Sequence, residues 1–193
     1  MCLLIKLQVF NKFMLAKLKS MFCKNNKELE YIWHATGHCF DKFDDEKVGS
    51  STIKYGWGIY FSYTRKGALE QNRNAKYLYR IPNKALSNNV FLHYSKQLVE
   101  QDEIIKKLAR KWYGNKTFSK DNFYRAGQGF YNDIFESERQ NVTDPNGCAA
   151  KYLRKNGISG GIIDGEASSR IIVLYDTSLW SHAECIKIED ADT

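Results

Sequence analysis

Apolar and polar residues alternate along the chain in a way that predicts several short strands. The run Ile171–Tyr175 (IIVLY) is apolar throughout, which is typical of a strand in the interior of a sheet. Other β-prone runs are bounded by glycine, proline or polar turns. These further strands are predicted at Tyr31–Trp33, Ile59–Phe61, Ala75–Ile81, Ile158–Ile163 and Ile186–Ile188.

Helical spacing is clearest in residues 96–113, where apolar residues lie along one side and basic residues crowd the rest. Residues 149–156 predict a second helix, which Gly157 ends. A short helix is expected in the second half of 62–71, and another begins at Phe130 after a loop over 115–129. Strands at both ends of the domain with helices between them predict an α+β fold whose sheet unites the two ends.

The first 24 residues contain five lysines and no acidic residue. Their apolar residues recur every three or four positions, which predicts a basic amphipathic helix. Such a helix packs on its own domain, or it docks on a partner or a membrane surface. We therefore divide the chain into this N-terminal helix, residues 1–26, and a domain over residues 27–193. The segment lacks the pattern of a secretory signal, and no run of 18 apolar residues predicts a membrane span.

Length and composition favour one globular domain. The 193 residues are 43% hydrophobic and carry a net charge of +7, which favours an anionic partner or serves solubility. The five cysteines are widely spread and contain no CxxC pair, so we expect neither a disulfide framework nor a zinc site. Scattered histidines likewise predict no metal. A reduced, cytoplasmic setting fits these cysteines best.

The chemistry-bearing residues concentrate between residues 31 and 62. His34 is expected near the end of a strand, and Gly56 and Gly58 flank Trp57, where a backbone can bend sharply or approach a ligand closely. There is no GxSxG elbow, no P-loop and no GxGxxG turn before a helix, which disfavours a serine hydrolase and a Rossmann fold.

Two motifs in this stretch resemble the NAD signature of the diphtheria-toxin-like ADP-ribosyltransferases, the class that includes the poly(ADP-ribose) polymerases. They are Trp33-His34-Ala35-Thr36-Gly37 and the run 55–62, YGWGIYFS. Residues 150–160 and 170–176 are similar to later segments of bacterial and phage members. The resemblance covers about residues 31–180. It implies a split antiparallel β-sheet core with intervening helices, and NAD as a substrate without a metal.

The resemblance also assigns roles to residues. His34 would bind the nicotinamide-ribose hydroxyl, and the backbone of Ala35, where the family usually has glycine, would pair with the carboxamide. Thr36 matches the family's hydroxyl residue. Tyr60 would stack on the nicotinamide ring, an interaction of roughly 0.5–2 kcal/mol for a cation on an aromatic face.

Two positions depart from the polymerase pattern. Gln71 stands where the polymerases have a second tyrosine, so Tyr63 or Phe61 would supply that wall. Ile171 stands where the polymerases have a glutamate. Several mono-transferases of the family also have an apolar residue at this position. Glu166 could instead act as a base from the preceding loop. Arg170 is placed to meet a phosphate.

These features predict a mono-ADP-ribosyltransferase that releases nicotinamide, a toxin-like effector in a toxin–antitoxin or antiviral-defence setting. The basic charge of the chain, including the cluster Lys106–Lys111, favours a nucleic acid over a protein as the acceptor. RNA is one such acceptor. The alternatives are a protein-modifying transferase and a non-catalytic binding module on a decayed transferase fold. The N-terminal helix is a candidate interface for an antitoxin or another neutralising protein.

Overall fold

The computed structural model describes residues 30–41, 48, 56–114, 125–142, 147–165 and 170–190. The predicted N-terminal helix and Glu166 lie outside these residues, and so does most of the loop between the two motifs. The predictions made for them therefore stay predictions.

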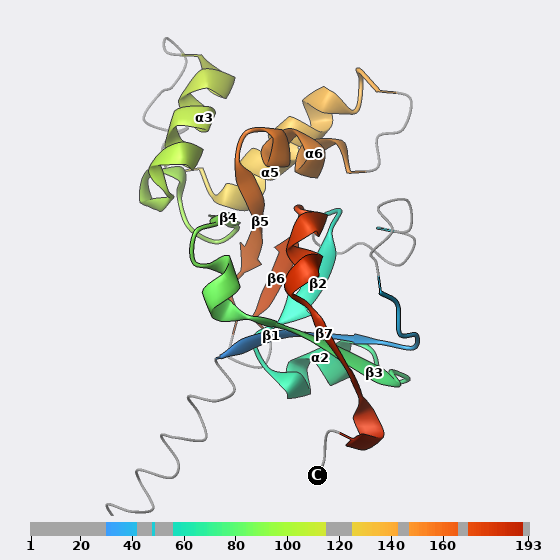
Figure 1. Cartoon of the computed structure of the whole chain (residues 1–193). Helices are drawn as coiled ribbons and strands as arrows, with labels where there is room; N and C mark the ends of the chain where they lie inside the picture. The colour runs from blue at the N-terminus through green and yellow to red at the C-terminus, as the bar shows by residue number, and fades with distance from the viewer. Residues whose placement is uncertain are drawn as a thin grey trace, which may run out of the picture.

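A mixed, mostly antiparallel sheet organises the described part of the chain, in the order β4-β5-β6-β2-β1-β3-β7 (Figure 1). Neighbouring strands run antiparallel except β4 and β5, which are parallel. The strands are β1 Tyr31–Thr36, β2 Ile59–Ser62, β3 Tyr77–Pro82, β4 Val90–His93, β5 Ile158–Ile163, β6 Ile171–Leu174 and β7 Glu184–Lys187. The predicted α+β class, with a sheet built from both ends of the domain, is confirmed.

The apolar run of β6 explains its place in the interior of the sheet. β6 lies between β5 and β2, and Ile172, Val173 and Leu174 are almost completely buried. Burial on both faces requires an uninterrupted apolar run, which is the pattern read from the sequence.

The sheet divides between β1 and β2. These two strands share only one pair of facing residues, Trp33 and Ser62, whereas β1 pairs with β3 along all six residues. In Figure 1, β2, β5 and β6 run nearly upright, while β1 and β3 cross the view. The sheet is therefore continuous in its strand order, yet its two halves turn away from each other at this point.

Gly58 makes the entry to β2 possible. Its φ is +148°, and a Cβ there would lie 2.6 Å from the carbonyl oxygen of Leu174 and 2.5 Å from Cγ1 of Val173. Backbone strain and overpacking each cost about 1–3 kcal/mol. We expect Gly58→Ala to lower the free energy of unfolding by roughly 2–6 kcal/mol, measured by urea denaturation.

Gly37→Ala is the matched control, because a Cβ at Gly37 meets nothing within 4 Å. Its stability should stay within about 0.5 kcal/mol of the wild type. Equal stability of the two variants would show that β6 does not constrain the entry to β2.

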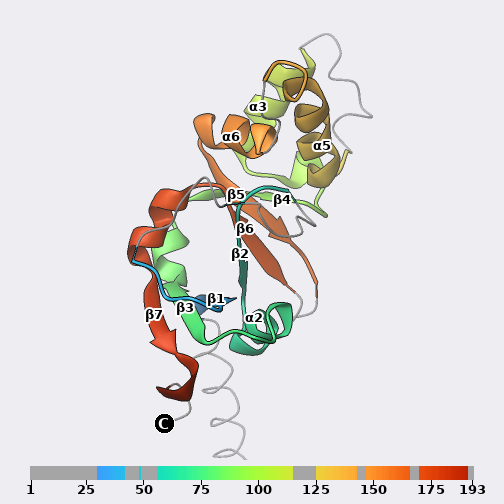
Figure 2. The same ribbon diagram turned by 90° about the vertical axis from the view of Figure 1, so that its right-hand side faces the viewer.

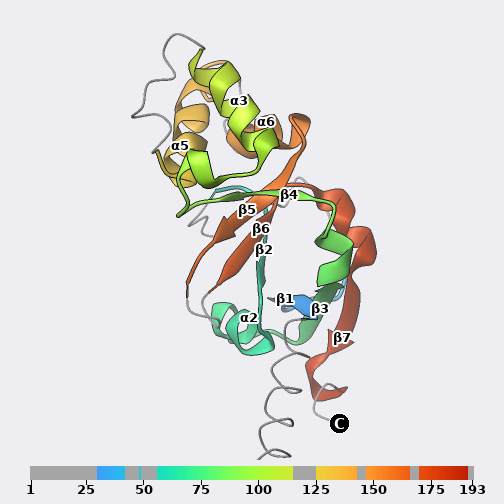
Figure 3. The ribbon, with the colours of Figure 1, turned by 90° about the vertical axis from the view of Figure 1, so that its left-hand side faces the viewer.

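Helices cover the sheet at two places. The α-helices are α2 Arg65–Gln71, α3 Glu103–Tyr113, α5 Gly127–Glu138 and α6 Cys148–Lys155. Figures 2 and 3 agree that α3, α5 and α6 gather beyond β4 and β5, while α2 lies at the opposite end of the domain. Short 3₁₀ helices complete the fold: η2 Asn83–Leu86, η3 Leu98–Glu100, η4 Thr177–His182 and η5 Ile188–Asp190.

Two of the predicted helices differ in extent from the observed ones. The helix expected over 96–113 begins only at Glu103, because Asp102 caps it by accepting from the amide of Ile104 at 2.8 Å. The residues before Asp102 form η3 and a turn. The loop expected over 115–129 is also shorter, because α5 already begins at Gly127. The helix predicted at 149–156 is confirmed within a residue at each end.

Differences among the strands are smaller. The last strand is Glu184–Lys187 rather than 186–188, because its register with β3 starts at Glu184 opposite Arg80. The prediction missed β4, Val90–His93.

Apolar residues fill both faces of the sheet. One cluster joins β4, β5 and β6 to α3, α5 and α6, and includes Tyr94 and Tyr175, whose hydroxyl oxygens lie 2.7 Å apart. A second cluster lies on the other face and includes Phe61, Tyr79 and Trp180. A third joins α2 to β1 and β3 through Ala68, Ala35 and Leu78.

Candidate functional site

His34 lies where the two halves of the sheet separate. It follows Trp33, the last residue of β1 that faces β2, and its ring Nδ1–H donates to the carbonyl oxygen of Tyr60 at 2.8 Å. The imidazole is half-buried. Its centroid lies 5.6 Å from that of Phe61 and 6.1 Å from that of Trp180, which it meets edge-on.

This contact fixes the chemical form of His34. Burial lowers the pKa of the imidazole, although the bond to the Tyr60 carbonyl opposes the effect. The ring is therefore neutral at pH 7, and Nδ1 carries its proton. Nε2 makes no hydrogen bond to the described residues, so its lone pair remains available to accept from a ligand hydroxyl.

Tyr60 contacts His34 through its main-chain carbonyl, and its ring does not take part in this hydrogen bond. Its hydroxyl donates to the carbonyl oxygen of Gly56 at 2.6 Å, across the turn that leads into β2. The ring packs against the helical side of the sheet, where Ile171 also packs. Phe61, next in sequence, is fully buried on the opposite face with His34. The structure thus joins the His34 ring to the Tyr60 carbonyl, and it places the Tyr60 and Ile171 side chains together on one face.

The next two residues, Ala35 and Thr36, already make hydrogen bonds within the protein. Ala35 is buried, and its carbonyl oxygen accepts from the side-chain amide of Asn72 at 3.3 Å. This leaves less of the Ala35 backbone for a carboxamide than the sequence motif implies. The hydroxyl oxygen of Thr36 accepts from the amide of His38 at 3.4 Å, within the turn after β1.

Ile171, Tyr63 and Arg170 lie at the end of β2 and the start of β6. Ile171 is half-buried and faces Ser62 across the two strands. The amide of Tyr63 donates to the carbonyl oxygen of Arg170 at 3.4 Å, and the Arg170 guanidinium lies 5.0 Å from the centroid of the Tyr63 ring. Tyr63 therefore packs against Arg170.

An aromatic wall beside His34 was not predicted from the sequence. Phe40 and Trp180 stack at 5.1 Å with 13° between their planes. Tyr79 joins them, because its hydroxyl accepts from the amide of Phe40 at 2.5 Å and donates to its carbonyl at 2.6 Å. These three residues are far apart in the sequence, so only the fold brings them together.

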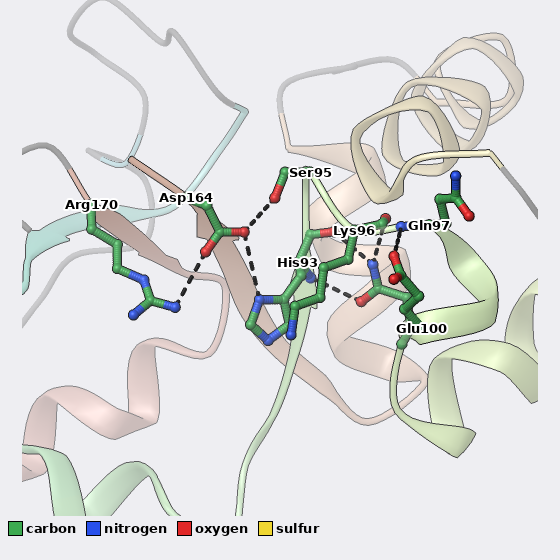
Figure 4. Close-up of polar contacts among 8 residues, drawn as sticks. His93, Ser95, Lys96, Gln97, Glu100, Asp164 and Arg170 are labelled. Carbon is green, nitrogen blue, oxygen red and sulfur yellow. Dashed lines mark hydrogen bonds and ion pairs between the residues drawn. The ribbon is translucent and has the colours of Figure 1, made fainter. Parts of the chain in front are cut away.

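A polar cluster lies where β4 and β5 end and β6 begins (Figure 4). It contains His93, Ser95, Asp164 and Arg170, which come from the ends of β4, β5 and β6. Sequence reasoning singled out Arg170 alone. His93, Ser95 and Asp164 lie at the ends of β4 and β5, which are far apart in the sequence, so no motif links them.

The basic face predicted on the helix over 96–113 is present on α3. Lys107 and Lys111 are exposed, while Lys106 is held by Glu103 at 2.7 Å. No set of three His, Cys, Asp or Glu side chains converges as a metal site within the described residues. In the same part of the chain, no helix has both the length and the apolar content to cross a bilayer.

Comparison with known proteins finds no matching protein family, no matching curated protein and no matching solved structure.

Proposed function

We propose that this protein is an NAD-dependent mono-ADP-ribosyltransferase that releases nicotinamide and transfers ADP-ribose to a macromolecule. The observation that supports the proposal most is the position and form of His34. It is a neutral imidazole with Nδ1 held by the Tyr60 carbonyl and Nε2 available, at the place where β1 and β2 separate. A ribose hydroxyl is a suitable donor to that nitrogen.

The sequence resemblance supplies the second line of support. Both motifs of the resemblance meet at this one point of the fold, although 26 residues separate His34 from Tyr60. The Tyr60 and Ile171 side chains share one face of the sheet, opposite the face of the His34 ring, and there Tyr60 would stack on the nicotinamide ring. An apolar residue at position 171 fits a transferase that adds one ADP-ribose and does not extend a chain.

The acceptor is proposed to be a nucleic acid, with RNA preferred to protein. The net charge of +7 and the exposed lysines of α3 favour a polyanion, because neutralising phosphates supplies most non-specific affinity. The proposed setting is a toxin-like effector in the cytoplasm, and an antitoxin-like protein would bind the N-terminal segment.

Labelled NAD tests the function and names the acceptor. Purified protein is incubated with a cell lysate and NAD labelled in its adenylate part, and aliquots are then treated with RNase, DNase or protease. We expect nicotinamide release, and we expect the macromolecular label to disappear after RNase treatment. Loss after protease alone would identify a protein-modifying enzyme instead. A protein that neither binds NAD nor releases nicotinamide would be a non-catalytic module.

A further inference from the structure

Two exposed cysteines meet at one edge of the sheet. Cys39 lies in residues 37–41, which follow β1, and Cys185 lies on β7, the edge strand beside β3. Both are free and exposed, and their thiols lie within hydrogen-bonding contact of each other. The third described cysteine, Cys148, is buried at the start of α6, where its thiol donates to the carbonyl oxygen of Phe135 at 3.8 Å.

Tyr79 holds the two thiols together. It pairs with Cys185 across β3 and β7, and residues that face each other in this way project to the same side of the sheet. Its hydroxyl oxygen lies 3.5 Å from Sγ of Cys39, and it also bonds the amide and the carbonyl of Phe40. The Tyr79 side chain contacts the Cys185 thiol as well. One phenol therefore fixes the segment after β1 against β7.

Cys185 is held in the thiol form. Although much of the residue is exposed, its sulfur lies against Tyr79 and Cys39, and this partial burial raises the pKa of the thiol. The contact with Cys39 raises it further. Because a thiolate is the form that attacks an oxidant, Cys39 is the thiol to react first, and Cys185 is placed to attack the product.

We propose that Cys39 and Cys185 form a reversible disulfide site that reacts with peroxides. The thiolate of Cys39 attacks one oxygen of hydrogen peroxide, the O–O bond breaks, and the departing hydroxide takes up a proton to become water. The sulfur of Cys185 then attacks the sulfenic acid on Cys39. The S–O bond breaks, and a second water leaves with the proton of Cys185. The two thiols lose two electrons, which the peroxide gains.

The surroundings leave room for the bond to form. A disulfide brings its sulfur atoms to about 2 Å, which is closer than a hydrogen-bonding contact, so one of the two segments must shift. Residues 37–41 lie outside the strands, and a Cβ at Gly37 would meet nothing within 4 Å. β7 can stay in place, since four of its residues pair with β3.

The disulfide would join the two segments that carry the aromatic wall. Phe40 follows Cys39 directly, and its stacking partner Trp180 lies on η4, which ends just before β7. A cross-link between residues so far apart in the sequence restricts the unfolded chain, so the oxidised protein should resist unfolding better than the reduced protein. This inference does not depend on the proposed transferase function.

Oxidation of the purified protein tests the site. Of the five cysteines, Cys2 and Cys23 lie outside the described residues, and replacing both with serine in every sample leaves three thiols. Excess hydrogen peroxide should lower the number of thiols counted after denaturation from three to one. Tryptic mapping should recover the Cys39 peptide joined to the Cys185 peptide. Dithiothreitol should restore all three thiols and lower the urea midpoint of unfolding again.

Single variants assign the order of the two steps. Cys185→Ser should stop the reaction at a sulfenic acid on Cys39, which dimedone traps as a stable adduct. Cys39→Ser should leave Cys185 mostly as a thiol, in keeping with its raised pKa. Cys148→Ser is the matched control, and it should form the same disulfide as its parent.

The unfolded chain shows whether the fold directs the pairing. In urea, Cys148 should pair preferentially with Cys185, because these two are closest in the sequence and the shorter loop costs less entropy. In the folded protein, the Cys39–Cys185 bond should exceed every other pair by at least roughly tenfold, because proximity favours it. This comparison needs no further variant, so it decides the question even if Cys185→Ser does not fold.

Three results would overturn the inference. The first is a sulfinic acid on Cys39 beside an unreacted Cys185 thiol. The second is a disulfide between two chains, seen as a dimer on a non-reducing gel. The third is the same mixture of pairs in the folded and the unfolded protein. All three leave the transferase proposal unaffected, because none of these measurements involves NAD.

Discussion

Replacing His34 with alanine is expected to lower NAD turnover about a hundredfold or more, because small misplacements of a bound substrate already cost that much. The variant removes the acceptor at Nε2 and the hydrogen bond that ties β1 to the carbonyl of Tyr60. Both interactions lie at the point where the two halves of the sheet separate. Nicotinamide release at saturating NAD, together with the Kd for NAD, measures the effect.

The bond between His34 and Tyr60 uses main-chain atoms of Tyr60, which provides a matched pair of variants. Tyr60→Phe keeps the carbonyl and the ring and loses the hydroxyl bond to Gly56. We expect it to retain most activity, while Tyr60→Ala, which removes the stacking surface, should lose it. His182→Ala serves as a histidine control. Turnover by His34→Ala equal to that of the controls would remove His34 from the site and leave the transferase proposal without its main support.

Strands and helices could be predicted from the sequence where burial gives their apolar residues a recognisable pattern. β6 is apolar throughout because both its faces are buried, and α6 shows its length because Gly157 follows it with a φ of +82°. β4 was not predicted, although at four residues it is as long as β2 and β6. The start of α3 was misplaced because the apolar spacing was followed back past Asp102, whose side chain caps the helix by accepting from the amide of Ile104.

The site was predictable only where its residues lie within one motif. His34 and Tyr60 were identified together, and the structure joins them, although through the Tyr60 carbonyl rather than its ring. Trp180 was missed because its contact with His34 spans most of the domain. The carboxylate expected from Glu166 lies outside the described residues. Asp164, two residues earlier, is the acidic group that the structure places beside Arg170.

Trp180→Ala is expected to lower the free energy of unfolding by about 3–5 kcal/mol, the usual loss when a buried tryptophan is truncated. Trp180 is 6% exposed and lies 4.4 Å from Tyr79 and 5.1 Å from Phe40, centroid to centroid. Trp112→Ala is the control, since Trp112 is only half-buried against Tyr152 and should cost less. Urea denaturation of both variants measures the difference.

The same substitution should change the titration of His34. Trp180 meets the imidazole edge-on, and burial is what lowers the pKa of His34. Removing the indole lets water reach the ring, so the pKa of His34 should rise towards its ordinary value in Trp180→Ala and stay unchanged in Trp112→Ala. NMR titration of the His34 ring in the folded variants follows this directly. An unchanged pKa in Trp180→Ala would mean that β1 and β2 bury His34 by themselves, and the aromatic wall would then support the fold without tuning the imidazole.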